Sequence, residues 1–128
     1  MTTSAPNFIG DFATVIGASG EVLREGTNGW TCLPFIAMPK MGFKSENEAA
    51  PACADQNAMA WASAYLSQTE PKLENDGWIW MLHGDTGVDN FRPYSEGDKE
   101  NTDPKDWIYS GAHLMLMPID PASLGSQT

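Results

Sequence analysis

An unbroken apolar run, Trp78–Leu82, most constrains the fold of this chain, because it leads directly into a loop rich in glycine and aspartate. Every residue of the run is large and apolar, and two are tryptophan, a composition typical of strands. Side chains alternate between the two faces of a strand, so both tryptophans share one face, and Ile79, Met81 and His83 share the other. We therefore expect a strand that is buried on both faces and ends where the core meets the loop.

Three segments before this run predict further strands. Phe12–Ile16 and Glu21–Glu25 flank a turn bounded by glycines, the pattern of a β-hairpin. Trp30–Leu33 follows Asn28-Gly29, a pair that supplies the positive φ angles of a tight reversal, so this segment is expected to continue the meander. Residues 34–52 contain three prolines and no sustained period, and they are expected to form a long loop.

One helix and one further strand complete the expected fold. Asp55 can cap the first turn of Gln56–Ser67, an alanine-rich stretch that ends before a proline. The segment Trp107–Met117 is apolar at both ends and carries an expected bulge at Ser110-Gly111. The chain is therefore predicted to be α+β, with a mainly antiparallel sheet of about five strands packed against one helix over residues 55–68.

Length and composition indicate a single domain over residues 1–128, with loose termini at 1–8 and 119–128. No run approaches the roughly 20 apolar residues that a membrane helix needs. The first residues lack the basic and apolar regions of a signal peptide, so either an export signal has been removed or the protein stays inside the cell. Seventeen acidic residues against seven basic ones give a net charge of -10, which would repel a phosphate backbone and excludes nucleic acid as a partner.

The two cysteines, Cys32 and Cys53, lie 21 positions apart, without a CxxC pattern or a nearby histidine. Zinc ligation is therefore disfavoured. We predict a disulfide between them, which would stabilise the fold by roughly 3 kcal/mol in the loop-entropy description. Two buried free thiols are the alternative, because the sequence alone does not fix the redox compartment.

The loop after the central strand, residues 83–94, is where binding groups are expected, because loops held by a rigid strand often carry function. Its candidate binding residues can ligate or hydrogen-bond, and they are Asp85, Asp89, Asn90 and Tyr94. The spacing does not match an EF-hand. Asp85, Asp89 and the Asn90 carbonyl could instead form a calcium site of another type.

His83 and His113 are the two histidines of the chain, and each could act as a general base with Asp85 or Asp89 as its partner. If the central strand pairs with the 107–117 strand directly across the loop, His113 lies about six residues beyond the position near His83. At about 3.4 Å per residue, the two side chains would be roughly 20 Å apart, too far to share a metal. No set of His, Cys, Asp or Glu has the spacing of a transition-metal site.

Three motifs resemble those of a family of small exported bacterial proteins that has no assigned activity. They are Arg24-Glu-Gly-Thr-Asn-Gly-Trp-Thr-Cys32, Gly84-Asp-x-Gly-x-x-Asn90 with Pro93-Tyr94, and Gly111-x-His-x-Met115, and the likeness spans roughly residues 12–118. The resemblance implies an extracytoplasmic setting, which suits the predicted disulfide. It also draws attention to shared residues, which are Trp30, Asp85, Asn90, Tyr94 and His113.

This chain departs from the family in three respects. It has no leader peptide, it carries Ala112 where a proline is usual before the histidine, and it ends where relatives continue into another strand. A sheet edge that relatives fill with their own strand could here be completed by a second chain.

The residue pattern favours a non-enzymatic binding or self-assembly protein. It contains no recognisable catalytic constellation, and it places five tryptophans and seven methionines in a small acidic chain, side chains that are favoured at interfaces. The expected partner is the chain itself, as a homo-oligomer, or another protein. A small hydrolase or isomerase that uses His83, His113 and Asp85 is one alternative, and a calcium-dependent binding module is the other.

Overall fold

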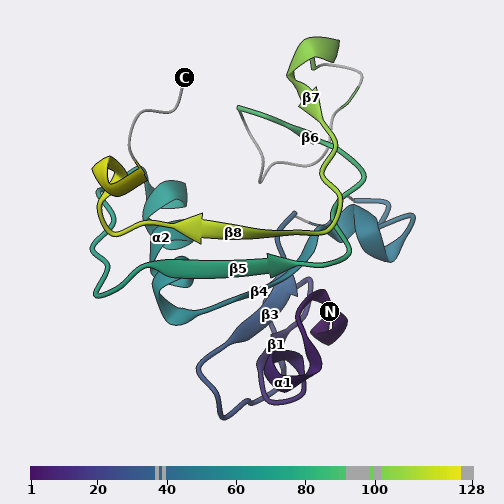
Figure 1. The fold of residues 1–128 in the computed structure, drawn as a ribbon. Helices are drawn as coiled ribbons and strands as arrows, with labels where there is room; N and C mark the ends of the chain where they lie inside the picture. The colour runs from purple at the N-terminus through teal and green to yellow at the C-terminus, as the bar shows by residue number, and fades with distance from the viewer. Residues whose placement is uncertain (37, 39, 92–98, 100–101, 125–128) are drawn as a thin grey trace.

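Six strands form one mixed, mainly antiparallel sheet in the computed structural model, and the longest helix packs against one face of that sheet (Figure 1). The structure describes residues 1–36, 38, 40–91, 99 and 102–124. The strands are β1 (Thr14–Ile16), β2 (Val22–Arg24), β3 (Thr31–Pro34), β4 (Pro51–Ala54), β5 (Gly77–Met81), β6 (Val88–Asp89), β7 (Trp107–Ile108) and β8 (His113–Met117). The helices are η1 (Thr2–Ser4), α1 (Asn7–Gly10), η2 (Glu46–Ala49), α2 (Gln56–Ser67), η4 (Pro104–Asp106) and η5 (Pro121–Leu124).

The main sheet has the strand order β2-β1-β3-β4-β5-β8. β3, β4, β5 and β8 pair antiparallel in succession, as do β1 and β2, whereas β1 and β3 run parallel. β6 and β7 form a separate antiparallel pair. This arrangement confirms the predicted α+β class, with one strand more in the main sheet than the five expected.

The additional strand, β4, begins inside the stretch 34–52, for which the sequence predicts a loop, and at residues 51–52 that prediction is wrong. All four residues of β4 are buried. Their small side chains lack the β-branched and aromatic signature of a strand, so propensity does not reveal it. Small residues are needed here because α2 approaches closely: a Cβ added at Gly77 of β5 would lie 2.4 Å from the Ala58 nitrogen of the helix.

β3 does not continue the hairpin as a meander, and this prediction is also wrong. It pairs parallel with β1, with Thr14 opposite Thr31. The chain returns past β1 because Arg24 Nε donates a hydrogen bond to the Ala13 carbonyl (3.1 Å), which holds the end of β2 beside the start of β1. Thr14 N then donates to the Trp30 carbonyl (2.8 Å), so β3 starts on the other side of β1.

β5 contains most of the apolar run, and its two faces differ in how deeply they are buried. Ile79 is fully buried and Met81 is 5% exposed on the face that packs against α2, whereas Trp78 on the opposite face is 40% exposed. The expectation of burial on both faces is therefore wrong for Trp78. The N-terminal segment covers that second face only as far as Trp80, which packs on its cluster.

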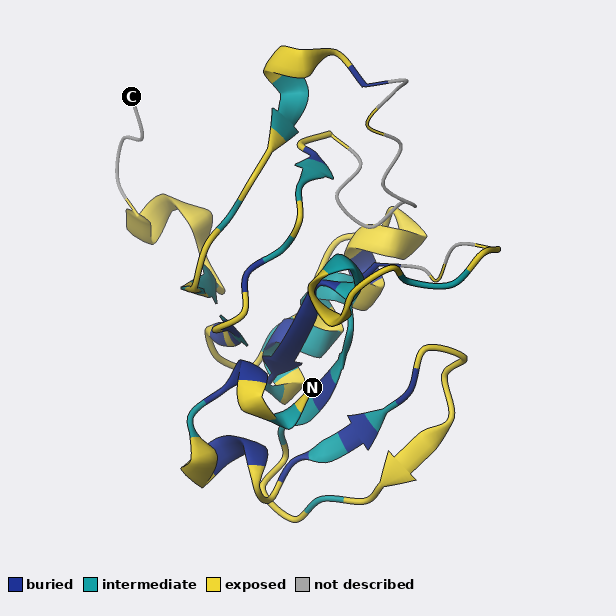
Figure 2. Ribbon diagram, turned by 90° about the vertical axis from the view of Figure 1, so that its right-hand side faces the viewer, coloured by how far each residue is buried: buried dark blue, intermediate teal, exposed yellow. Residues whose placement is uncertain are grey.

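The N-terminal segment packs against the sheet, although the sequence predicts loose residues at 1–8. Ser4 and Ala5 are buried, and the Ser4 carbonyl accepts a hydrogen bond from Leu82 N (2.9 Å). Figure 2 shows this buried segment beside the N-terminus in dark blue, while β2 is exposed along its length. At the other end η5 has no buried residue, and residues 125–128 lie outside the described part of the chain.

α2 confirms the predicted helix and begins directly after its Asp55 cap. Asp55 Oδ1 accepts a hydrogen bond from Ala58 N (2.8 Å), and its Oδ2 accepts one from Trp78 N (2.9 Å). One carboxylate therefore fixes both the start of the helix and the start of β5. Within the described residues, neither α2 nor any other helix is long and apolar enough to cross a membrane.

The predicted disulfide between Cys32 and Cys53 is present and joins β3 to β4 at positions directly opposite each other. Both cysteines are 0% exposed and lie in one apolar cluster with Ala5, Ile9 and Ala13. The N-terminal segment thus covers the bond on the face of the sheet opposite α2.

We predict that the double substitution Cys32→Ala/Cys53→Ala lowers the free energy of unfolding by about 3 kcal/mol, because the unfolded chain regains the entropy that the cross-link removes. Urea unfolding followed by tryptophan fluorescence measures this change. Reductant should lower the stability of the unsubstituted chain during unfolding and should leave the double variant unchanged. Equal stabilities of the two chains without reductant would contradict the prediction.

Candidate functional site

One aspartate closes the loop after β5 against the segment that precedes β8. Asp85 Oδ1 accepts hydrogen bonds from Gly87 N (2.9 Å) and Ser110 N (3.1 Å), and Asp85 N donates to the Ser110 carbonyl (3.0 Å). These bonds join segments that are 25 residues apart in the sequence. Asp85 therefore orders the backbone on both sides of the loop.

Two glycines make this closure possible. Gly84 has a φ of +62° and Gly87 a φ of +109°, in the region that favours glycine. A Cβ added at Gly84 would lie 2.2 Å from the Ser110 carbonyl oxygen, and one added at Gly87 would lie 2.2 Å from Trp107 Nε1. The Gly84-Asp-x-Gly87 pattern is thus a requirement of the close approach between the loop and the segment before β8.

Asp89, the last residue of β6, accepts hydrogen bonds from outside the β6–β7 pair. Asp89 is 8% exposed, and its carboxylate accepts hydrogen bonds from Phe91 N (2.9 Å) and from Thr102 Oγ1 (3.4 Å). Asp85 and Asp89 therefore accept these hydrogen bonds from different sets of donors. In the part of the chain that the structure describes, no group of three His, Cys, Asp or Glu is placed to hold a metal ion. The calcium site that combines these two aspartates with Asn90 stays a prediction.

A cavity of about 290 Å³ lies between α2, the β5–β8 pair and the β6–β7 pair. Its lining is mainly apolar, with a few polar side chains, a composition typical of ligand pockets. The cavity brings together three residues that the sequence singles out, namely Asp85, Asn90 and His113. The apolar lining includes side chains that the sequence does not single out as binding residues, among them Trp61, Met81, Met115 and Met117.

The two histidines line different cavities. His113 Nδ1 lies 2.6 Å from the Gly111 carbonyl oxygen, at the wall of the cavity described above. His83 Nε2 lies 2.6 Å from Thr3 Oγ1, in a second cavity of about 300 Å³ that also contacts the N-terminal residue Met1. Among the described residues, neither imidazole is hydrogen-bonded to a carboxylate.

The predicted register between the two histidines is wrong. β7 pairs with β6, and only β8 pairs with β5, with His113 opposite Met81. A single bulged strand over 107–117 does not form, because Ser110 is hydrogen-bonded to the loop after β5 instead of to β5 itself. His113 is therefore two residues, and not six, from the position that would lie opposite His83.

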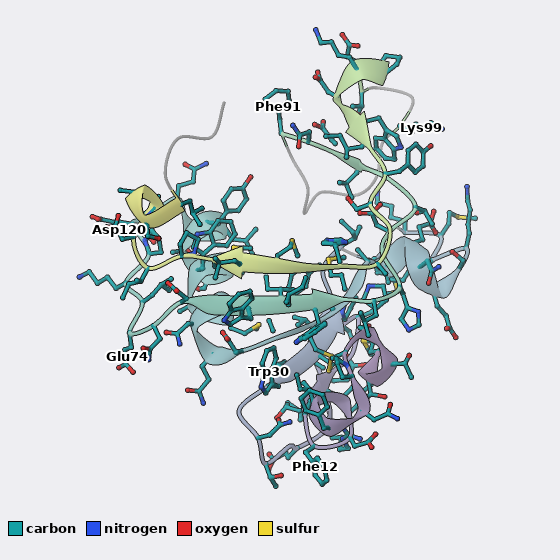
Figure 3. The ribbon with its side chains drawn as sticks, in the orientation of Figure 1. Phe12, Trp30, Glu74, Phe91, Lys99 and Asp120 are labelled. Atoms are coloured by element: carbon teal, nitrogen blue, oxygen red, sulfur yellow. A yellow bond between two sulfur atoms is a disulfide. The ribbon has the colours of Figure 1, made fainter. Side chains whose placement is uncertain are left out.

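Trp30 and Asp89, two other predicted binding residues, do not line the cavity that His113 lines. Trp30 packs against the N-terminal cluster beside the disulfide, and Figure 3 places it on the opposite side of the β5–β8 pair from Phe91 and Lys99. Tyr94 lies outside the described residues. The cavity is therefore built without Trp30.

A cation lies beside an exposed phenol near the β6–β7 pair. Lys99 Nζ is 2.7 Å from the Tyr109 hydroxyl oxygen and 5.4 Å from the centre of its ring. The hydrogen bond from the ammonium group stabilises the phenolate, so the pKa of Tyr109 is lowered below its usual value. The sequence gives no sign of this pair, because the two residues are ten positions apart and no local pattern links them.

The sequence suggests an open sheet edge without saying which strand forms it, and the structure places β8 at that edge. Among the described residues, β8 pairs only with β5, so its other backbone edge is unpaired. Leu114 of β8 is 43% exposed, and on the same face Trp78 is 40% exposed. Together with Leu116, which lies opposite Trp78, they form an apolar surface on the side of the sheet that α2 does not cover. The uninterrupted sequence His113–Met117 is the signal that could have pointed to this edge.

Comparisons with known proteins give no relative of this chain: no family model, no curated protein and no solved structure matches it. The fold nevertheless defines its class. In the part of the chain that the structure describes, it is an α+β protein with an open mixed sheet, a buried disulfide, a partly open cavity lined by methionines and an unprotected edge strand.

We predict that Gly84→Ala lowers the free energy of unfolding by about 1–3 kcal/mol more than Gly20→Ala. Gly20 is a matched control, because its φ is +83° and nothing lies within 4 Å of an added Cβ. Both alanines are strained by positive φ, but only the one at position 84 collides with the Ser110 carbonyl. Urea unfolding and hydrogen exchange of the Ser110 amide measure the difference, and equal losses would refute the role of the close contact.

Proposed function

We propose that this protein is a non-enzymatic assembly protein, in which two copies pair through β8 and form one continuous sheet. The supporting observation is the unpaired apolar edge of the main sheet. An edge strand presents a row of N–H and C=O groups that can hydrogen-bond to a strand of another chain.

The two edges of the sheet differ in their protection against such pairing. β2 is three residues long, and the charged residues Glu21, Arg24 and Glu25 surround its two exposed apolar side chains. β8 is five residues long and contains no acidic residue, lysine or proline between His113 and Met117. Charges and prolines are the usual protection of an edge strand, so β8 is the edge that can accept a partner.

The sequence of β8 is complementary to itself in the antiparallel direction. A two-fold axis through Met115 would place Leu114 opposite the partner's Leu116 and His113 opposite the partner's Met117. Every cross-strand pair then contains an apolar side chain, and no like charges face each other. A second copy of the chain therefore fits this edge.

Charge opposes the association at long range and does not oppose it at the interface. Each copy carries a net charge of -10, while β8 contributes no acidic group. Salt screens repulsion between separated charges and leaves the apolar contacts in place. Dimerisation should therefore strengthen as the salt concentration rises.

The proposed setting is extracytoplasmic. The buried Cys32–Cys53 disulfide supports this assignment, because such bonds persist in oxidising compartments. The acidic surface is compatible with a secreted or periplasmic protein, since a net charge far from zero favours solubility.

We predict that light scattering across a concentration series gives a mass rising from 13.9 kDa toward twice that value, and that Leu114→Lys keeps the chain monomeric. A lysine at this position places a charge on the edge that the two copies would share. Leu23→Lys is the matched control, because Leu23 is also an exposed edge leucine, 59% exposed, but lies on β2.

Two results would overturn the proposal. The first is a monomer at every concentration and salt level up to the solubility limit. The second is a dimer that Leu23→Lys disrupts and Leu114→Lys does not, since the interface would then lie at the other edge. Circular dichroism of both variants controls for folding.

A further inference from the structure

Three methionines and one histidine meet in the cavity beneath the β6–β7 pair. His113, Met115 and Met117 lie on one face of β8, because side chains of a strand alternate with a period of two. Met81 on β5 is the cross-strand partner of His113. Side chains at such positions have Cβ atoms about 4.5–5.5 Å apart, well within the reach of a methionine thioether.

These thioethers are largely withdrawn from water. Met81 is 5% exposed, and Met115 and Met117 are half-buried and pack against the same cluster as Met81 and Ile79. His113 is half-buried and also lines the cavity. The three methionine side chains therefore line a mainly apolar cavity whose wall also includes His113.

The hydrogen bond of His113 prepares its ring for a ligand. The Gly111 carbonyl oxygen can only accept a hydrogen bond, so the proton lies on Nδ1, 2.6 Å away. Nε2 then carries a free lone pair, and it accepts no hydrogen bond from the described residues. Histidines that bind metals usually donate their other ring N–H to a carbonyl or carboxylate in this way.

We propose that His113 Nε2 and the thioethers of Met81 and Met115, with Met117 beside them, bind one Cu(I) ion. Thioether sulfur is a soft ligand that selects Cu(I), whereas calcium and magnesium require oxygen and zinc favours thiolate, imidazole and carboxylate. The ligand set is neutral, which suits a singly charged ion. The net charge of -10 also raises the concentration of cations near the protein.

The alternative role of these methionines is to fill the core, since methionine is a common filler of irregular gaps. The substitution of leucine for methionine separates the two roles. Leucine keeps the apolar volume at a usual cost below about 1.5 kcal/mol, but it removes the sulfur. Met81→Leu and Met115→Leu should therefore fold and lose the ion.

The test is titration of the protein with Cu(I) under anaerobic conditions in competition with a chromophoric Cu(I) chelator. We expect one ion per chain. Met81→Leu, Met115→Leu and His113→Gln should each lower the affinity by more than about tenfold, because even mutation of a residue that hydrogen-bonds to a metal ligand typically costs that much. Met41→Leu is the matched control, because Met41 is 96% exposed and does not line the cavity.

A second readout needs no substitution. Ag(I), a diamagnetic substitute for Cu(I), should shift the methyl NMR signals of Met81 and Met115 and leave that of Met41 unchanged. Unaltered affinity in both leucine variants, or silver shifts confined to exposed methionines, would show that the cluster is only core packing. Leu114→Lys retains every proposed ligand, so it should bind Cu(I) normally even where it abolishes assembly, and the two proposals can fail separately.

Discussion

The close contact between α2 and the small residues of β4 and β5 is the constraint on which the rest of the structure depends. The helix backbone lies so near β5 that Gly77 has no room for a Cβ, and the facing positions of β4 are alanines. Asp55 reinforces the contact, because its carboxylate accepts one hydrogen bond from the first turn of α2 and another from Trp78 N near the start of β5. This contact fixes β5, which positions β8 and the cavity beside it.

The parts of the fold that local chemistry determines could be predicted from the sequence. The capping aspartate and the alanine-rich stretch after it define α2, and the aromatic run defines β5. β4 could not be predicted, because its small side chains are selected by the neighbouring helix and not by strand propensity. The parallel pairing of β1 and β3 depends on bonds between Arg24 and a distant carbonyl, which no local pattern reveals.

The candidate site, like the fold, could be predicted from the sequence only in part. Asp85, Asn90 and His113 stand out in the sequence as polar groups beside an apolar strand, and the structure brings all three to one cavity. Their separation in sequence could not fix the register of β8, which depends on where the loop is fastened to Ser110. The methionines of the lining could not be predicted, because a single sequence does not indicate which apolar side chains line a cavity.

The position of β8 also has a consequence for how the chain folds. Its partner β5 lies more than thirty residues earlier, so the backbone edge of β5 that pairs with β8 stays open until β8 itself has been synthesised. Pairing between such distant segments is slow, and apolar strands that are still unpaired are prone to aggregation. The β5–β8 pairing is therefore a late step in forming this sheet, and the unpaired edge of β5 is most exposed to wrong contacts before that step.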